Sequence, residues 1–420
     1  MTIIAIKHQL MQLFSDVSLN KIAFGCGFTQ RVRNIEPRTL ILSLISALST
    51  GKINAIAQLH QKYNGLCPDT QQVSYRPFYN QLRKPAFEAF IKIIVRFFMA
   101  QWVEKQVAIP QKLAKFQNVI LQDGSSFQVH PALAEVFPYR FKTTAAAVEC
   151  HITMSLFSQT PTAMTVTADT AAERAYLPAP AELKGQLLLA DAGYPDFDYF
   201  EQLSHSDASF IVRGKKSLNP LIVAAHNGQG KLLPKLAGKR LKTVTRRIHR
   251  SEVLDLHCQR NGYEFRIIRR WLKEEKRFCI WLTNLPAEEF TPNDVMDIYR
   301  CRWQVELLFK ELKSHTNWQG FATRKDSLVT GLIWSSLLTL LVRRTMARRL
   351  FPEVSLLKAA QNTDIWLRPI IENLLQRAWS ETCFWLEKAK DYLCRNAFKT
   401  RQRKSCKNKT LEACFARLNF

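Results

Sequence analysis

The hydrophobic pattern of this 420-residue chain changes near residue 117, and that change most constrains the fold. Before it, apolar residues recur at helical spacing in 38–49 and 87–99, which predicts helices. After it, short apolar runs alternate with turn residues and one expected helix at 197–203. The predicted strands are 118–122, 145–157, 162–167, 186–190 and 209–213. This alternation predicts the α/β class, with a mixed sheet flanked by helices.

The charge of the chain points to a polyanionic partner. Its formal net charge is +25 and its pI is about 9.8, which favours nucleic acid first and an acidic membrane surface second. Residues 231–280 hold fifteen basic and five acidic residues, and we expect a DNA-tracking surface there rather than an ordinary solvated face. Residues 395–410 hold seven basic and no acidic residues, which predicts either a DNA-binding or a disordered tail.

Cysteine spacing and hydropathy argue against a zinc knuckle, a signal peptide and a membrane-spanning helix. No two of the ten cysteines have the spacing of a zinc knuckle, so we expect reduced cysteines in a cytoplasmic protein. The N-terminus lacks the pattern of a signal peptide. The longest apolar run, 328–342, is too short to span a bilayer comfortably, which predicts a buried helix and no membrane partner.

The N-terminal region contains a pair of helices that could read DNA. One amphipathic stretch runs from Ile53 to Tyr63 and is broken by Gly65 and Pro68. Ser74 then offers an N-cap to a second helix with a polar face. Both a DNA-reading helix-turn-helix and an ordinary helical hairpin fit this pattern.

The stretch 299–313 (YRCRWQVELLFKELK) carries an unusual helix face. Its chemistry-bearing residues are spaced by 3, 4, 4 and 3, which places them on one side of a helix: Tyr299, Arg302, Glu306, Lys310 and Lys313. A structural helix would repeat apolar residues on such a face. The alternatives are a charged face toward solvent and a functional face toward a ligand.

Two aspartates favour the functional alternative. Asp123 and Asp191 each follow an apolar predicted strand and stand close before a glycine, so we expect them at strand ends, where α/β sheets place their ligands. With Glu306 they would form an oxygen-rich site for two Mg²⁺ ions, with Mn²⁺ as a possible substitute. Other carboxylates nearby rank lower as ligands: Asp196, Asp198 and Glu311.

Three blocks of the sequence resemble those of a known family. The blocks Asp123-Gly124-Ser125, Ala190-Asp191-Ala192-Gly193-Tyr194 and Tyr299-x2-Arg302-x3-Glu306-x6-Lys313 are similar, in order, to those of DDE transposases of the insertion-sequence-four (IS-four) family. The resemblance implies an RNase H-like catalytic core, interrupted by a β-rich insert, with helical N- and C-terminal regions. It implies Asp123, Asp191 and Glu306 as catalytic metal ligands.

The same resemblance implies which residues bind DNA. Tyr299 and Arg302 would contact phosphates near the transferred end, and Arg213 would help to hold that end. The side chains expected to bind DNA beside the site are Lys310 and Lys313. Trp281 is a candidate for stacking against a flipped base, with a core tryptophan as the alternative. Ala192 departs from the family, whose members often have arginine there.

The expected domains follow from the resemblance and the composition together. They are a DNA-end-binding helical domain at 1–115, the first part of the catalytic core at 116–206, a basic β-rich insertion at 207–285, the core helix with the signature at 286–345, and a helical C-terminal region with a basic tail at 346–420.

The implied function is cut-and-paste DNA transposition. The expected partners are double-stranded DNA, as terminal inverted repeats and target, and a second copy of the chain, as a homodimer on DNA. The expected location is the bacterial cytoplasm, in association with the nucleoid. Two alternatives remain open: an RNase H-like nuclease without strand transfer, and a non-catalytic DNA-binding protein derived from a transposase.

Overall fold

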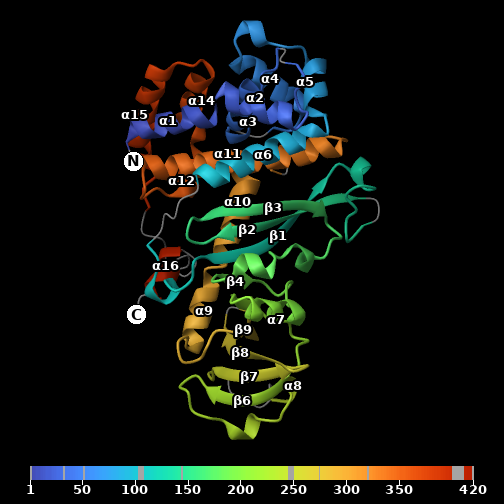
Figure 1. Ribbon diagram of the computed structural model, residues 1–420, viewed down its shortest axis with the longest axis vertical. Helices are drawn as coiled ribbons and strands as arrows, with labels where there is room; N and C mark the ends of the chain where they lie inside the picture. Colours follow the sequence, from blue (N-terminus) through green and yellow to red (C-terminus); the bar gives the residue numbers. More distant parts are fainter. Residues whose placement is uncertain are drawn as a thin grey trace.

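The computed structural model describes residues 2–31, 34–50, 53–102, 108–142, 145–244, 250–273, 275–318, 321–399 and 411–418. Figure 1 shows a helical region at one end of the molecule, a sheet below it, and the strands of the 207–285 segment at the far end. The basic tail lies, from residue 400 to 410, outside the described residues, as do Arg246 and Arg247 of the basic segment.

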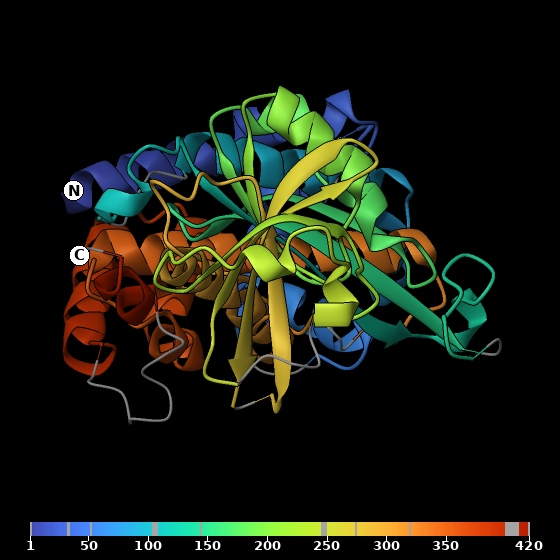
Figure 2. The ribbon, with the colours of Figure 1, turned by 90° about the horizontal axis from the view of Figure 1, so that it is seen from below.

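One nine-stranded mixed sheet forms the middle and far end of the molecule, in the order β3-β2-β1-β4-β5-β9-β8-β7-β6. The strands are β1 Val119–Val129, β2 Ala146–Ser155, β3 Thr160–Ala168, β4 Leu187–Ala190, β5 Ser209–Arg213, β6 Leu221–Asn227, β7 Leu254–Arg260, β8 Tyr263–Leu272 and β9 Arg277–Thr283. Strands β1, β4 and β5 are parallel, and the other pairs are antiparallel. The predicted α/β class, with a mixed sheet and flanking helices, is confirmed. Seen from below, the strands fan out, as expected of a twisted sheet (Figure 2).

The predicted end of the first strand is wrong. Strand β1 does not stop at Asp123 but continues to Val129, because β2 pairs with it along that whole length. Its parallel partner β4 reaches only Gln122. Asp123 therefore lies just beyond the end of the parallel pairing, and Asp191 follows β4 directly. Both aspartates still reach the same edge of the parallel strands, as the sequence predicted.

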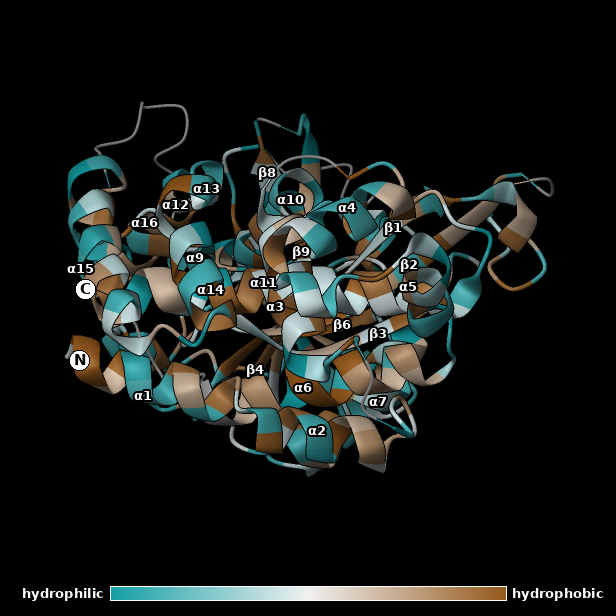
Figure 3. Cartoon of the chain, turned by 90° about the horizontal axis from the view of Figure 1, so that it is seen from above, coloured by the Kyte–Doolittle hydropathy of each residue, from teal (hydrophilic) through white to brown (hydrophobic). Residues whose placement is uncertain are grey.

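The helices before the sheet are α1 Ile3–Leu13, α2 Asp16–Gly25, α3 Pro37–Ser49, α4 Ile56–Leu66, α5 Tyr75–Leu82 and α6 Ala86–Trp102. The predicted helical pair is confirmed as α4 and α5. Ser74 is the N-cap residue of α5, although its side chain makes no capping hydrogen bond. A role of this pair in reading DNA stays a prediction. Outer helices such as α1 and α2 alternate hydrophilic and hydrophobic residues, which is typical of helices with one face on a core (Figure 3).

The predicted buried helix is confirmed as α11, Asp326–Leu350. It is long and apolar enough to cross a membrane by length and composition, but nearly all of it is buried inside the molecule, between α6 and α3 among others. A Cβ on Gly331 would collide with the ring of Phe87 on α6, so glycine permits the close approach of these two helices. The helices that follow are α12 Leu356–Gln361, α13 Thr363–Trp366, α14 Arg368–Leu375, α15 Trp379–Asn396 and α16 Leu411–Ala416.

The basic segment after β5 extends the main sheet through β6 to β9, with the short helix α8, Leu241–Val244. Part of its charge is structural. The guanidinium of Arg266 is buried and forms an ion pair with Asp255 at 2.7 Å. Arg269 is also buried, with its guanidinium carbon 3.5 Å from the ring centre of Phe278. The charge count of this segment therefore overstates the positive surface that could follow DNA. The domain boundaries stay predictions.

Candidate active site

Asp123 and Asp191 come together because β1 and β4 run parallel as neighbours. Each carboxylate accepts a hydrogen bond from a nearby glycine: Asp123 from Gly124 N–H at 3.0 Å, and Asp191 from Gly193 N–H at 2.7 Å. Burial raises the pKa of Asp123 to about 7, and the negative charges of Asp191 and Glu306 add to the rise, against the opposing effect of Arg302. The negative charges of the other two carboxylates are therefore close enough to act on Asp123.

The signature stretch is two helices and not one, which corrects the prediction. Helix α9, Pro292–Arg300, begins at a capping box of Thr291 and Asp294. Helix α10, Trp303–His315, follows after a tight turn at Cys301 and Arg302. In this turn each N–H donates to the carbonyl three residues earlier, as Arg302 does to Tyr299, so the backbone is wound more tightly than an α-helix. Tyr299 thus lies on α9, and Glu306 lies in the first turn of α10.

Arg302 stands between two of the carboxylates. Its guanidinium donates to Asp123 Oδ2 at 3.0 Å and to Glu306 Oε1. Burial disfavours the charged form, but the effects of Tyr299, Asp123 and Glu306 are larger together and raise the pKa of Arg302. Its Nε–H is buried and has no hydrogen-bond partner among the described residues. One donor of Arg302 is therefore left for another acceptor.

The carboxylates suit a hard divalent cation by chemistry and by charge. Carboxylate oxygens are preferred Mg²⁺ ligands. Arg302 pairs with two of the three carboxylates, Asp123 and Glu306, so one guanidinium charge stands beside two carboxylate charges. The oxygens are not drawn together around one point, however: within the described ranges, no group of three acidic, histidine or cysteine side chains is close enough to hold a metal ion. The donor set fits a metal, and its present geometry is set by Arg302.

An aromatic and cationic cluster extends the site from Arg302 to β5. Arg213 and Trp281 lie opposite each other on β5 and β9, with the guanidinium carbon 5.0 Å from the ring centre. Trp281 meets Tyr299 edge-on at 6.2 Å, and Arg302 lies 5.8 Å from the Tyr299 ring centre. Burial raises the pKa of Tyr299 to about 12, so its hydroxyl stays protonated and able to donate.

Within this cluster, Trp281 has the environment of a core tryptophan. Its side chain is only 3% exposed, and it packs with the main hydrophobic core. Stacking against a base would require it to leave this position. Arg213 is engaged as well, because it donates to Glu275 at 2.8 Å. Their DNA contacts remain predictions.

On the other side of Glu306, the two lysines border a small cavity. Lys310 and Lys313 line a space of about 400 Å³ together with Asp123 and Glu306. Lys310 is exposed, and Lys313 is half-buried, where burial lowers its pKa. The structure thus brings the predicted lysines to two of the three predicted carboxylates.

Two further carboxylates, Glu149 and Glu173, escaped the sequence reasoning. A Cβ on Gly124 would lie 2.7 Å from Glu149 Oε1, and a Cβ on Gly193 would collide with Glu173 and lie 3.0 Å from Asp191 Oδ1. Burial raises the pKa of both, that of Glu149 to about 7. Neither stands at a strand end, since Glu149 is within β2 and Glu173 begins a 3-10 turn. The only hint in the sequence was the glycine that follows each aspartate. A side chain at Gly124 would contact Glu149, and one at Gly193 would contact Glu173.

The lower ranking of the competing carboxylates agrees with their positions. Asp196 caps α7, Phe197–His205, by accepting from Tyr199 N–H, and Asp198 is exposed in the first turn of that helix. Glu311 is buried in ion pairs with Arg343 at 2.7 Å and Arg344 at 2.6 Å, which hold its pKa near 2 against the effect of burial. Asp196 and Glu311 therefore have structural roles.

Comparison with known proteins identifies the family. The transposase DDE domain family matches residues 114–342. Two Escherichia coli proteins are similar: the transposase for insertion sequence element IS421, and InsL, a candidate transposase for IS186A of strain K12. Each is 34% identical over 78 residues, or 19% of this chain, so the match spans 21% of each relative's length. A solved piggyBac transposase synaptic complex with hairpin DNA aligns with 96% of this chain and 87% of that one, at 10% identity and a TM-score of 0.48.

The predicted DDE assignment is thereby confirmed, while the finer IS-four placement stays a prediction. The matched domain begins just before β1, ends within α11, and includes all three predicted carboxylates. Because this match covers more than half of the chain, the protein belongs to the family of transposases with a DDE domain.

Proposed function

We propose that this protein is a cut-and-paste transposase that cleaves DNA at the inverted repeats of its insertion sequence and joins the freed ends to target DNA. The observation that carries the proposal is that Asp123 and Asp191 lie at one edge of the parallel strands, where Arg302 bridges Asp123 to Glu306, inside a transposase domain. The net charge of +25 supports DNA as the partner.

In this proposal Asp123, Asp191 and Glu306 hold two Mg²⁺ ions, which Mn²⁺ can replace. When bound, such ions lower the pKa of an attacking hydroxyl and stabilise the leaving oxygen of a phosphodiester. The chain's own residues bind and orient the strand. Arg302 offers its unpaired Nε–H to a phosphate oxygen, and the protonated Tyr299 hydroxyl offers a second donor.

Strand joining is the decisive test of this function. End DNA labelled on the transferred strand should yield a product covalently joined to unlabelled target DNA in Mg²⁺. Cleavage without a joined product would indicate a nuclease, and specific binding with neither product would indicate a non-catalytic DNA-binding protein. We further propose that the active form is a homodimer on DNA in the bacterial cytoplasm, because two ends must be joined in one event.

Metal replacement should separate binding from chemistry. Mg²⁺ and Mn²⁺ should support cleavage of end DNA, whereas Ca²⁺ should permit binding with little cleavage, because it accepts a looser and larger oxygen shell. The measurement is cleavage and gel-shift binding on the same labelled DNA. Full cleavage in excess chelator would contradict the assignment of the three carboxylates as metal ligands.

Conservative changes at Arg302 and Tyr299 should slow cleavage without unfolding the protein. Arg302→Lys loses the planar fork that can serve carboxylates and a phosphate together, and we expect a cleavage rate at least roughly tenfold lower, equivalent to about 1.4 kcal/mol. Tyr299→Phe removes one donor and should have a smaller effect in the same direction. Cleavage rates on end DNA are compared with melting temperatures, and wild-type rates in both variants would leave Glu306 as the functional side chain of this stretch.

A further inference from the structure

A large polar cavity lies between the helical region and the C-terminal end of α10. Its volume is about 1000 Å³, and we call it the helical cavity. Its walls come from the end of α3, from α4, from the end of α10, and from α12 to α14. The walls are tied together: Asn317, after α10, donates to Ile53 O at 2.6 Å, and Thr363 donates to Ser49 O at 2.5 Å. The cavity is thus built from segments far apart in the sequence.

The helical cavity adjoins the candidate active site. Lys313 and Ser314 line both the helical cavity and the smaller space that contains Asp123 and Glu306. A polymer held at the carboxylates could therefore run past Lys313 into the helical cavity.

The lining of the helical cavity is positively charged. Lys62, Lys313 and Arg368 face one carboxylate, Asp364. Lys62 donates to Thr50 O at 2.6 Å, and neither it nor Lys313 forms an ion pair with a residue in the described part of the chain. Burial lowers the pKa of Lys62, and the nearby charge of Arg368 lowers it further. The positive charges of Lys62 and Arg368 are therefore close enough to act on each other, although Arg368 also pairs with Glu372 at 2.6 Å.

The size and position of the helical cavity favour a single strand of nucleic acid over a duplex. Its volume is at the upper end of the range for pockets that hold drug-sized molecules, which is enough for a few nucleotides of one strand and too little for a duplex. The cluster of Tyr299, Trp281 and Arg213 adjoins the carboxylates through Arg302, whereas the helical cavity opens beyond Lys313, near the other end of α10. A DNA strand bound across the carboxylates would therefore extend toward this cluster in one direction and toward the helical cavity in the other.

We propose that the helical cavity binds a single-stranded segment of DNA on the side of the scissile phosphate opposite the transferred end, with Lys62 and Arg368 contacting its phosphates. This inference rests on the proposed function. It adds a binding site for flanking DNA that the three carboxylates and their immediate neighbours do not provide.

The test compares two DNA ends bound by the full chain in Ca²⁺. One is a blunt, pre-cut end, and the other carries a single-stranded flank of about ten nucleotides on the cut strand, within the range that single-strand sites cover. The wild type should bind the flanked end about tenfold more tightly. The variant Lys62→Gln/Arg368→Gln should lose this gain, keep its affinity for the blunt end, and lower the salt dependence of flank binding by about 1.4 in log–log slope, as expected for two lost phosphate contacts.

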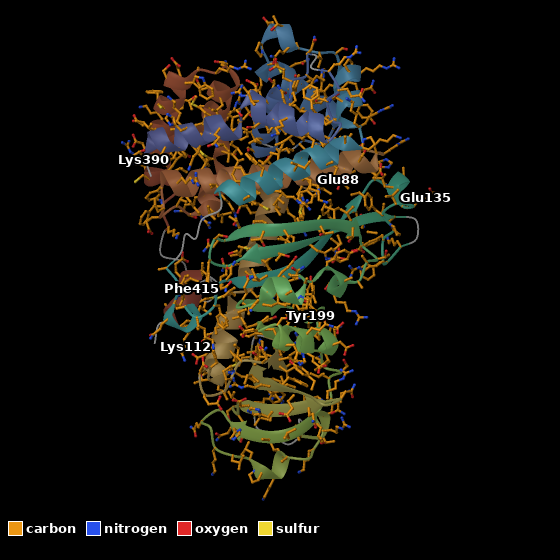
Figure 4. The ribbon with its side chains drawn as sticks, viewed as in Figure 1. Glu88, Lys112, Glu135, Tyr199, Lys390 and Phe415 are labelled. Carbon is orange, nitrogen blue, oxygen red and sulfur yellow. The ribbon has the colours of Figure 1, made fainter. Side chains whose placement is uncertain are left out.

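A matched pair of lysines provides the control. Lys388 and Lys390 are exposed on α15, and Lys390 lies at the outer edge of the helical region (Figure 4). Lys388→Gln/Lys390→Gln removes the same charge and should behave as wild type, with unchanged melting temperatures in both variants. An unchanged flank gain in Lys62→Gln/Arg368→Gln would overturn the inference, as would an equal loss with the blunt end. Absence of cleavage and joining by the wild type in Mg²⁺ would instead overturn the proposed function.

Discussion

Each of the single substitutions Asp123→Ala, Asp191→Ala and Glu306→Ala should lower the rate of end cleavage by about a thousandfold or more. This loss is equivalent to about 4 kcal/mol of transition-state stabilisation. The reason is that each change removes carboxylate oxygens from the proposed metal site. Binding to end DNA should stay nearly intact, because the proposed DNA contacts extend well beyond these side chains. Cleavage and gel-shift binding of the purified variants in Mg²⁺ measure both effects.

A neighbouring carboxylate supplies the control for this experiment. Asp198 is seven residues from Asp191 but exposed on α7, so Asp198→Ala should cleave at the wild-type rate. Ordinary cleavage by Asp123→Ala, Asp191→Ala or Glu306→Ala would remove that residue from the proposed metal site.

Glu311→Ala should destabilise the protein by about 3–5 kcal/mol, because it leaves two buried guanidinium groups without their shared carboxylate. Arg343 is fully buried and Arg344 nearly so, and both belong to α11 at the centre of the helical region. The stability comes from a pKa of Glu311 held near 2, below that of the unfolded chain. This contribution is therefore present at neutral pH and lost as the pH falls toward 2.

Denaturant unfolding of Glu311→Ala and Glu289→Ala compares the contribution of a buried ion pair to the free energy of unfolding with that of an exposed one. Glu289 pairs with Lys115 at 2.6 Å, but both side chains are about half exposed. Such exposed pairs contribute about 0–1 kcal/mol, so Glu289→Ala should unfold almost as the wild type does. Equal midpoints for the two variants would show that the buried triad does not stabilise α11.

The sequence alone determined the parts of the fold that depend on local pattern. Helical periodicity predicted α3 and α6, and an amphipathic stretch followed by an N-cap residue predicted α4 and α5. Continuous apolar runs predicted the buried helix α11 and the strands β4 and β5, since a central parallel strand is buried on both faces. The resemblance of the three blocks around Asp123, Asp191 and Glu306 to those of DDE transposases was enough to predict the family, because such blocks are compared along the sequence alone. Their catalytic roles are still predictions.

The tertiary structure decided what depends on neighbours from distant segments. Strand β1 runs past Asp123 because β2 supplies pairing there, and no local signal records that partner. Trp281 is buried because α9 and β5 close over it, although its residue type alone also permits an exposed base-stacking role.

The same dependence on distant neighbours governs the charges. Arg266 is structural because Asp255 lies on the adjacent strand, whereas Lys62 is left without an ion pair among the described residues. A count of charged residues in the sequence does not distinguish these two cases. The free energy of a charge depends on its burial and on its nearest opposite charge, and only the folded chain sets both.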